Sequence, residues 1–341
     1  MRALGHRNRL SSDLTGLFRY QSIKKSSDGM VCGYTHISTD FRVCYIPSKL
    51  PEYGAVFSVP TPVFDSCGTA HAVEHMVLRG SKKFPTSDII AFLLRDIGCT
   101  HTNARTMDGI TCYDLAARTL QEFIDGYKVL LYALFNPTFS DQTFREECWC
   151  WDGHYLSGSV FSELQSRESH CPELILDTVK GAVFKGSYLE NCPAGHSELL
   201  VSLTIDDIKA YHSKWYIPSQ TNVWVCGNLD INVLLAATND ALHGVKPDKQ
   251  ETIPPIKVVS GIEYKNSLPG NALKVTVLSF VSDQALSMSN QLAFEILISY
   301  FLQSNEFCTF LEQNSIDDVA PICTTIFGHG LFFCAFFKES F

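Results

Sequence analysis

Two histidines and a glutamate fall within five residues of the chain, at His71, Glu74 and His75. Residues four apart on a helix lie on one face, so both imidazoles can reach one metal ion. Glu74 can lean towards the same ion without binding it, and a carboxylate in that place suits a general base. A zinc ion with such donors lowers the pKa of a bound water to about 7 and polarises a carbonyl group. The spacing therefore predicts the metal site of a zinc hydrolase.

The order His-x-x-Glu-His is the reverse of the commoner zinc-peptidase motif but presents the same helix face. Taken alone, the five-residue pattern leaves a second interpretation open, a surface helix with two solvated histidines. The sequence around this motif must therefore distinguish the two interpretations.

Strands and helices alternate irregularly around this segment. Short β-rich runs bounded by turn formers predict strands at 41–46, 54–59, 99–103, 109–115, 221–226, 272–280 and 330–337. Apolar periodicity and capping residues predict helices at 69–80, 86–95, 120–134, 158–169, 175–183, 204–212 and 291–303. Strand pairs interrupted by long helices, without a regular βαβ pattern, predict an α+β fold. We expect two-layer domains in which a mainly antiparallel sheet packs against helices.

The length of 341 residues predicts two domains. A stretch rich in proline, glycine and charge marks a linker between them. The predicted limits are an N-terminal tail at 1–17, a first domain at 18–243 that holds the metal site, a linker at 244–256 and a partial second domain at 257–341.

Net charge, hydrophobicity and cysteine content indicate which kinds of partner and which cell compartment to expect. The net charge of −9 argues against nucleic acid, and no apolar run is long enough to span a membrane. The 13 cysteines are odd in number and irregularly spaced, which predicts reduced thiols and an intracellular protein, cytoplasmic rather than mitochondrial. A mitochondrial transit peptide remains the alternative to a solvated tail, because the first 25 residues carry many basic residues and one acid, namely Arg2, Arg7, Arg9, Arg19, Lys24 and Lys25 against Asp13.

Two further motifs follow the metal-site segment. One is Gly80-Ser-Lys-Lys-Phe-Pro85, and the other is Asn103-Ala-Arg-Thr106-Met-Asp108-Gly-Ile-Thr111-Cys-Tyr113. Together with His71, Glu74 and His75, they resemble the insulinase/pitrilysin family of zinc metallopeptidases, and more narrowly its presequence-protease-like branch. The resemblance covers residues 18 to about 240 and implies a pitrilysin-type metallopeptidase domain, with an incomplete second domain of the same family.

The resemblance also implies the remaining site residues. The family's third zinc ligand is a glutamate on a later helix, which corresponds to Glu163 in Gly158-Ser-Val-Phe-Ser-Glu163-Leu-Gln165, with Glu168 as the nearby alternative. In the family an extended peptide adds to a sheet edge beside the metal. Asn103 and Ala104 are therefore the expected substrate-binding residues, and a contact from His101 stays open.

The implied function is that of a zinc-dependent endopeptidase or oligopeptidase acting on unstructured peptides, with one Zn²⁺ per chain. Active family members contain four homologous domains, and the second half supplies an arginine and a tyrosine to the substrate carbonyl. We therefore expect a second chain or half to complete the catalytic chamber, and the chain alone to be a poor enzyme. The alternative is a non-catalytic or truncated relative that acts as a partner or scaffold subunit. One departure is Ala194-Gly195-His196, which replaces a Gly-Gly pair in a loop near the substrate.

Overall fold

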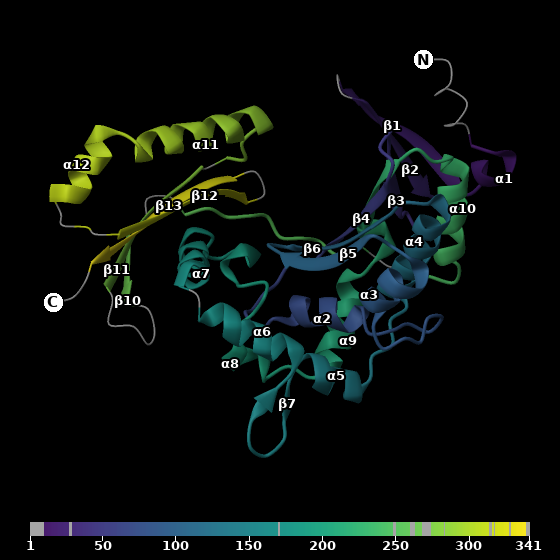
Figure 1. The fold of residues 1–341 in the computed structure, drawn as a ribbon, viewed down its shortest axis with the longest axis horizontal. Helices are drawn as coiled ribbons and strands as arrows, with labels where there is room; N and C mark the ends of the chain where they lie inside the picture. The colour runs from purple at the N-terminus through teal and green to yellow at the C-terminus, as the bar shows by residue number, and fades with distance from the viewer. Residues whose placement is uncertain are drawn as a thin grey trace. The chain divides into compact units, whose positions relative to one another are not determined.

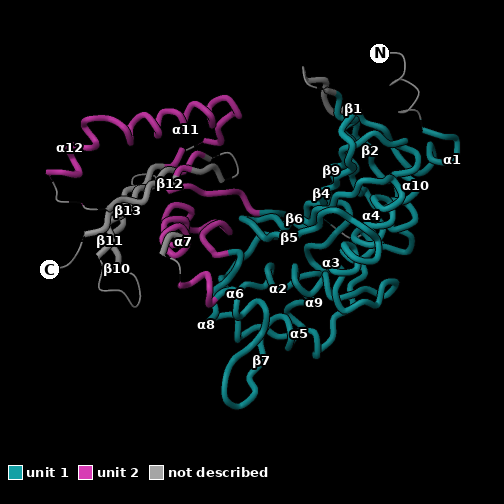
Figure 2. The backbone as a smooth tube through the Cα atoms, viewed as in Figure 1, with its two compact units in different colours: residues 1–164, 193–253 teal, residues 165–192, 254–341 magenta. Residues whose placement is uncertain are grey.

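The structure is a computed structural model that describes residues 10–26, 29–169, 171–247, 250–259, 263–267, 274–282, 284–313, 316, 318–326 and 329–338. The chain forms two compact units, residues 1–164 with 193–253 and residues 165–192 with 254–341 (Figure 2). Each unit has a sheet and helices of its own (Figure 1). The domain limits predicted at 18–243 and 257–341 refer to units of the family rather than to spatial units, and they stay a prediction.

The larger unit contains a seven-stranded sheet of order β1-β2-β3-β9-β4-β6-β5, antiparallel except where β3 pairs with β9. A separate two-stranded hairpin joins β7 to β8. The strands are β1 (Phe18–Ser26), β2 (Gly29–His36), β3 (Arg42–Pro47), β4 (Tyr53–Pro60), β5 (His101–Met107), β6 (Ile110–Ala117), β7 (Cys150–Trp151), β8 (Leu156–Ser157) and β9 (Asn222–Gly227).

Helices cover one face of this sheet, and Figure 1 shows α2 (Thr69–Val77), α9 (Ile205–Trp215) and α5 (Asp141–Glu147) on the same side of β5 and β6. On the covered face Phe57 of β4 and Tyr113 of β6 are fully buried, and Phe57 packs against Tyr127 of α4. On the opposite face Val56 and Trp224 are 39% and 43% exposed. This alternation is the period of two that a half-buried strand requires. The predicted α+β class is confirmed.

Four helices of the larger unit, α2, α4, α6 and α9, begin within one residue of the predicted start, whereas α1, α5, α8 and α10 were not predicted. Two of them, α4 and α9, start with capping boxes, at Thr119 with Glu122 and at Thr204 with Asp207. The helices are α1 (Ser12–Thr15), α2 (Thr69–Val77), α3 (Ile89–Phe92), the π-helical turn η1 (Leu93–Ile97), α4 (Leu120–Phe135), α5 (Asp141–Glu147), α6 (Ser159–Glu168), which ends in the smaller unit, α8 (Ser197–Leu200), α9 (Ile205–Trp215), the 3-10 turn η3 (Pro218–Gln220) and α10 (Ile231–Ala241).

The helix predicted at 86–95 differs from the observed one. Its cap is Asp88, whose side chain accepts from Ala91 N, and α3 passes after one turn into η1. Aspartate is as good a helix cap as serine or threonine, so residue type does not separate Asp88 from the neighbouring Thr86 and Ser87.

The smaller unit has a four-stranded antiparallel sheet of order β10-β11-β13-β12. Its elements are α7 (Cys171–Val183), the 3-10 turn η2 (Tyr188–Glu190), β10 (Glu263–Ser267), β11 (Lys274–Val281), α11 (Met288–Leu302), α12 (Asn305–Gln313), β12 (Asp318–Ile326) and β13 (His329–Lys338). Among the residues that the structure describes, no helix combines the length and the apolar character needed to cross a membrane. The eleven cysteines whose side chains are described form no disulfide.

Candidate metal centre

Helix α2 is held by a tight crossing of two backbones. It begins after Gly68, which has a φ of 81°, and no side chain caps it. A Cβ added to Gly68 would lie 2.6 Å from Ala194 O, and one added to Gly195 would lie 2.4 Å from Gly68 Cα. Only glycine fits at both positions, because each combines a positive φ with this close approach. The loop at 193–196 therefore lies directly on the first turn of α2.

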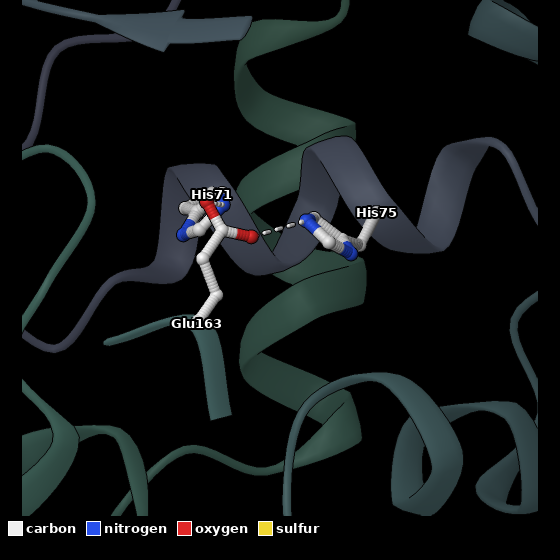
Figure 3. Close-up of side chains that lie close together, drawn as sticks. All are labelled: His71, His75 and Glu163. Atoms are coloured by element: carbon white, nitrogen blue, oxygen red, sulfur yellow. Dashed lines mark ion pairs between the residues drawn. The ribbon is translucent and has the colours of Figure 1, made fainter. Parts of the chain in front are cut away.

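His71, His75 and Glu163 come together on one side of this helix, where His71 is buried and Glu163 is exposed. Glu163 Oε1 lies 3.6 Å from His71 Nε2, and Glu163 Oε2 lies 3.6 Å from His75 Nε2. One ligand atom from each of the three residues lies within 4.8 Å of the others. Figure 3 shows the Glu163 carboxylate directed at the two imidazoles. The three residues that were predicted as metal ligands thus lie together in the structure. Glu168 is outside this cluster of described residues.

The opposite ring nitrogens of both histidines have acceptors. His71 Nδ1 lies 3.3 Å from Ala194 O, and His75 Nδ1 lies 3.2 Å from Glu147 Oε2. An acceptor at Nδ1 favours the tautomer that leaves the Nε2 lone pair for a metal, and metal-binding histidines usually have such a partner. Two imidazole nitrogens and one carboxylate also match the ligand preference of catalytic zinc. The residues present therefore fit a zinc ion.

Glu74 lies on the same helix, buried against strand β5. Its Oε2 accepts a 2.6 Å hydrogen bond from the Thr106 hydroxyl, which in turn contacts Thr111 Oγ1 at 3.1 Å. Burial raises the pKa of Glu74, and the Thr106 hydrogen bond and His75 oppose that rise in part. A buried carboxylate with a raised pKa and a fixed orientation is suited to accept and return a proton.

The pKa of His75 reflects its two carboxylate neighbours. Burial lowers this pKa, but hydrogen bonds to Glu147 and Glu163 outweigh burial and raise it to about 9. Burial would raise the pKa of Glu147, yet its contacts with His75 and Arg79 hold that pKa below the usual range. These contacts make the site a compact arrangement of paired charges, which a cation can enter by replacing a proton.

The two predicted substrate-binding residues lie on β5, which among the described residues pairs with β6 alone. Side chains alternate along this strand. Ala104 is on the same face as Thr106 and packs against the core, whereas Asn103 is exposed on the other face. A contact from Asn103 to a peptide at this edge would thus come from its backbone. His101 contacts Asp114 Oδ2 at 2.5 Å, and Arg105 binds the other oxygen of that carboxylate.

Sequence reasoning missed Glu147 and assigned no role to Thr106. Glu147 ends α5, a helix that was not predicted although Ser140 caps it and Phe144 and Cys148 mark its apolar side. Thr106 was part of a quoted motif, but its contact with Glu74 spans 32 residues and depends on how β5 packs on α2.

Comparisons with known proteins identify the family of this chain. Residues 64–185 match the family described as "Insulinase (Peptidase family M16)", and residues 202–316 match "Peptidase M16 inactive domain". The chain belongs to the insulinase/pitrilysin family of peptidases.

Two curated relatives show how large a part of a relative's length the chain matches. It is 29% identical to an uncharacterised protein of Schizosaccharomyces pombe over 67% of this chain and 22% of that protein. It is 30% identical to presequence protease 1, chloroplastic/mitochondrial, of Arabidopsis thaliana over 52% of this chain and 17% of that protein. The chain thus spans about a fifth of the length of these relatives.

Solved structures show the same fold. A protease from Helicobacter pylori superposes with a TM-score of 0.65 at 15% identity, over 94% of this chain and 75% of that one. Pitrilysin superposes with a TM-score of 0.64 at 17% identity, over 94% of this chain and 35% of that one. The fold class expected from the sequence is therefore that of M16 peptidases.

Proposed function

We propose that this chain carries the catalytic centre of a zinc-dependent endopeptidase or oligopeptidase. The observation that carries the proposal is the convergence of His71, His75 and Glu163, with Glu74 buried beside them on the same helix. His71, His75 and Glu163 would hold the ion. When bound, zinc would activate water and polarise the scissile carbonyl. Family membership and the presequence protease relative support this assignment.

Glu74 is the proposed general base and acid. Its carboxylate would take the proton of the attacking water and later deliver it to the leaving amine. Thr106 keeps one carboxylate oxygen engaged, so the proton would be handled at the other oxygen, Oε1. General acid–base groups typically contribute about 10²–10⁴ in rate.

Strand β5 is the proposed docking edge for substrate. A peptide that adds to this edge at residues 103 and 104 would draw its affinity from backbone hydrogen bonds, so sequence preference would be loose. Unstructured peptides would be cleaved and stable folded proteins would not, because only an extended backbone can pair with a strand. Comparable cleavage rates for a peptide and a stable globular protein would contradict this.

The test of function is the Glu74→Gln variant. Peptide hydrolysis should fall by at least about 10²-fold, while zinc content stays the same, since Glu74 is not a ligand. The matched control is Glu295→Gln, which alters a carboxylate on α11 in the smaller unit. Equal hydrolysis by wild type and Glu74→Gln would remove Glu74 from the mechanism.

A second candidate is a partner or scaffold subunit without turnover. The match of residues 202–316 to a domain described as inactive favours it. A zinc-loaded chain that cleaves no peptide, alone or with an added partner half, would select this candidate.

A partner chain or a further half of the same family is proposed to complete the catalytic chamber. Such a half would supply donors for the tetrahedral oxyanion, and the loss of one such donor typically costs about 10²–10³ in turnover. The chain alone should therefore turn over peptides slowly. Family-like turnover by a monomer, with its mass measured in solution, would contradict this. A mitochondrial location stays the alternative to the cytoplasm, as the names of three relatives include that organelle.

A further inference from the structure

Four hydroxyl groups lie behind the hydrogen bond that Thr106 donates to Glu74, and the proposed chemistry does not use them. They belong to residues of three segments of the larger unit, namely Thr61 directly after β4, Thr111 and Tyr113 on β6, and Tyr216 directly after α9. All four residues are buried, with no more than 5% of any of them exposed. A buried hydroxyl without a hydrogen bond costs free energy, so each of these groups needs a partner.

Thr111 is the centre of this group. It faces Thr106 directly across the β5–β6 pair, and their Oγ1 atoms lie 3.1 Å apart. Thr111 Oγ1 also lies 2.8 Å from Thr61 Oγ1, and its side chain hydrogen-bonds the hydroxyl of Tyr216. The Tyr216 hydroxyl in turn lies 2.6 Å from the hydroxyl of Tyr113. These contacts form one connected group of hydroxyls that ends at the proposed general base.

The number of protons available fixes the direction of these bonds. A hydroxyl has one proton and two lone pairs, whereas an ionised carboxylate can only accept, so Thr106 donates its proton to Glu74. The proton between Thr106 and Thr111 must therefore come from Thr111. Thr111 then accepts from both Thr61 and Tyr216, which fills its two lone pairs. The O–H bonds of the group thus all point along the contacts towards the Glu74 carboxylate.

We propose that Thr111 is a positioning residue for Glu74 and that it acts through the hydroxyl of Thr106. Its O–H bond keeps the Thr106 hydroxyl directed at Glu74 and strengthens that donation, because hydrogen bonds in a chain polarise one another. The inference rests on the proposed role of Glu74 as general base. A proton transfer needs the base within hydrogen-bond reach of the water, and a carboxylate fixed at Oε2 keeps Oε1 in one place.

The test is a double-mutant cycle on the hydrolysis of an unstructured peptide by the full zinc-loaded chain. Thr111→Val removes the hydroxyl at similar side-chain shape and should lower kcat about two- to tenfold, the typical effect of one neutral hydrogen bond. KM and zinc content should stay the same, because Thr111 reaches the site only through Thr106 among the described contacts. In a Thr106→Val background the same change should alter kcat by less than about twofold, since the connection to Glu74 is already cut.

Two further variants separate positioning from general stability. Thr111→Ser keeps a hydroxyl and should be near wild type in kcat. The matched control is Thr238→Val, because Thr238 is fully buried in the same unit and its hydroxyl contacts the Tyr127 hydroxyl at 2.9 Å and the Leu234 carbonyl at 2.8 Å. Thr238→Val should lower the melting temperature as Thr111→Val does, yet leave kcat unchanged.

Crystal structures of the metal-free proteins provide a readout besides turnover. The Glu74 carboxylate should have one orientation in wild type and in Thr111→Ser, and more than one in Thr111→Val. Should Thr111→Val not fold, Thr111→Cys carries the test, because a thiol is only a weak donor.

Wild-type kcat with an unchanged Glu74 orientation in a folded Thr111→Val or Thr111→Cys variant would overturn this inference and leave the general base standing. An equal loss from Thr111→Val with and without Thr106→Val would also overturn it, since the effect would then not pass through Thr106. Equal hydrolysis by wild type and Glu74→Gln would overturn the proposed role of Glu74 and this inference with it.

Discussion

Helices α2 and α11 occupy corresponding places in two sheets of the same design. In the larger unit the strand order is β4-β6-β5, and in the smaller one it is β11-β13-β12. In both, the first of these strands leads into the helix, and the other two follow it as an antiparallel hairpin. The smaller unit therefore repeats part of the topology of the larger one.

The two helices differ in what surrounds them. Helix α2 packs against α9, α5 and β5, and its buried residues include His71 and Glu74. Helix α11 has no fully buried residue, and Met288 and Tyr300 are 86% and 76% exposed. Its only charged residue is Glu295. The topology thus provides a helix at this place, but chemistry requires both ligand side chains and neighbouring elements that shield and orient them.

The largest expected contrast between the two regions is in stability. Phe57→Ala removes a fully buried ring from the core under α4 and should cost about 3–5 kcal/mol in the free energy of unfolding. Leu292→Ala on α11 alters a side chain that is 60% exposed and should change it by less than about 0.5 kcal/mol. Urea unfolding followed by circular dichroism measures both. A large loss from Leu292→Ala would break the comparison, since α11 would then be covered in solution.

The next contrast is in the response to acid. Burial lowers the pKa of His212 on α9 to about 4, although its ring bonds the Leu134 carbonyl at 2.8 Å. The unfolded chain binds this proton below about pH 6.5 and the folded one only near 4, so stability should fall as pH drops through that window. His212 alone accounts for up to about 3 kcal/mol of this loss.

His212→Gln should flatten the dependence of the unfolding free energy on pH between 6.5 and 4, with the exposed His154→Gln variant as control. His36 in the same unit also has a pKa lowered by burial and contributes in the same direction. Parallel stability curves for wild type and His212→Gln would show that His212 does not titrate differently on unfolding.

A smaller effect concerns the support of Glu74. Thr106→Val removes the hydroxyl that donates to Glu74, while Thr106→Ser keeps it. A hydrogen bond to a charged group is worth about 1.5–3 kcal/mol, so kcat for a peptide should fall about tenfold or more in Thr106→Val. KM and zinc content should change little, and Thr106→Ser should be near wild type. Equal kcat values for the two variants would mean that the hydroxyl does not position Glu74.

Local patterns predicted much of the fold and pointed to His71, Glu74 and His75 of the proposed site, whereas Glu163 came from the family resemblance. Residues 120–134 show strong apolar periodicity that stops at Asn136-Pro137, and α4 lies there. The four-residue spacing of His71 and His75 placed both rings on one helix face. By contrast, β1 and β2 were not predicted, because runs such as Phe18–Ser26 mix lysine and serine with apolar residues and become strands only by pairing.

Long-range contacts are the part that the sequence could not provide. The parallel pairing of β3 with β9 brings Val43 beside Val223, although the two residues are far apart in the sequence. The contact of Glu147 with His75 spans 72 residues and depends on the placement of α5. Periodicity reports which face of an element is buried, but not which distant element covers it.

We propose that α2, and not its counterpart α11, carries a zinc site. The most direct measurement is the zinc content of the purified chain after equilibration with micromolar free zinc and removal of unbound metal. We predict one zinc per chain in wild type and in Leu292→Ala on α11, none in the double variant His71→Ala/His75→Ala, and weakened binding in Glu163→Gln. A wild-type chain without zinc, or a double variant that retains one zinc per chain, would contradict a zinc site on α2.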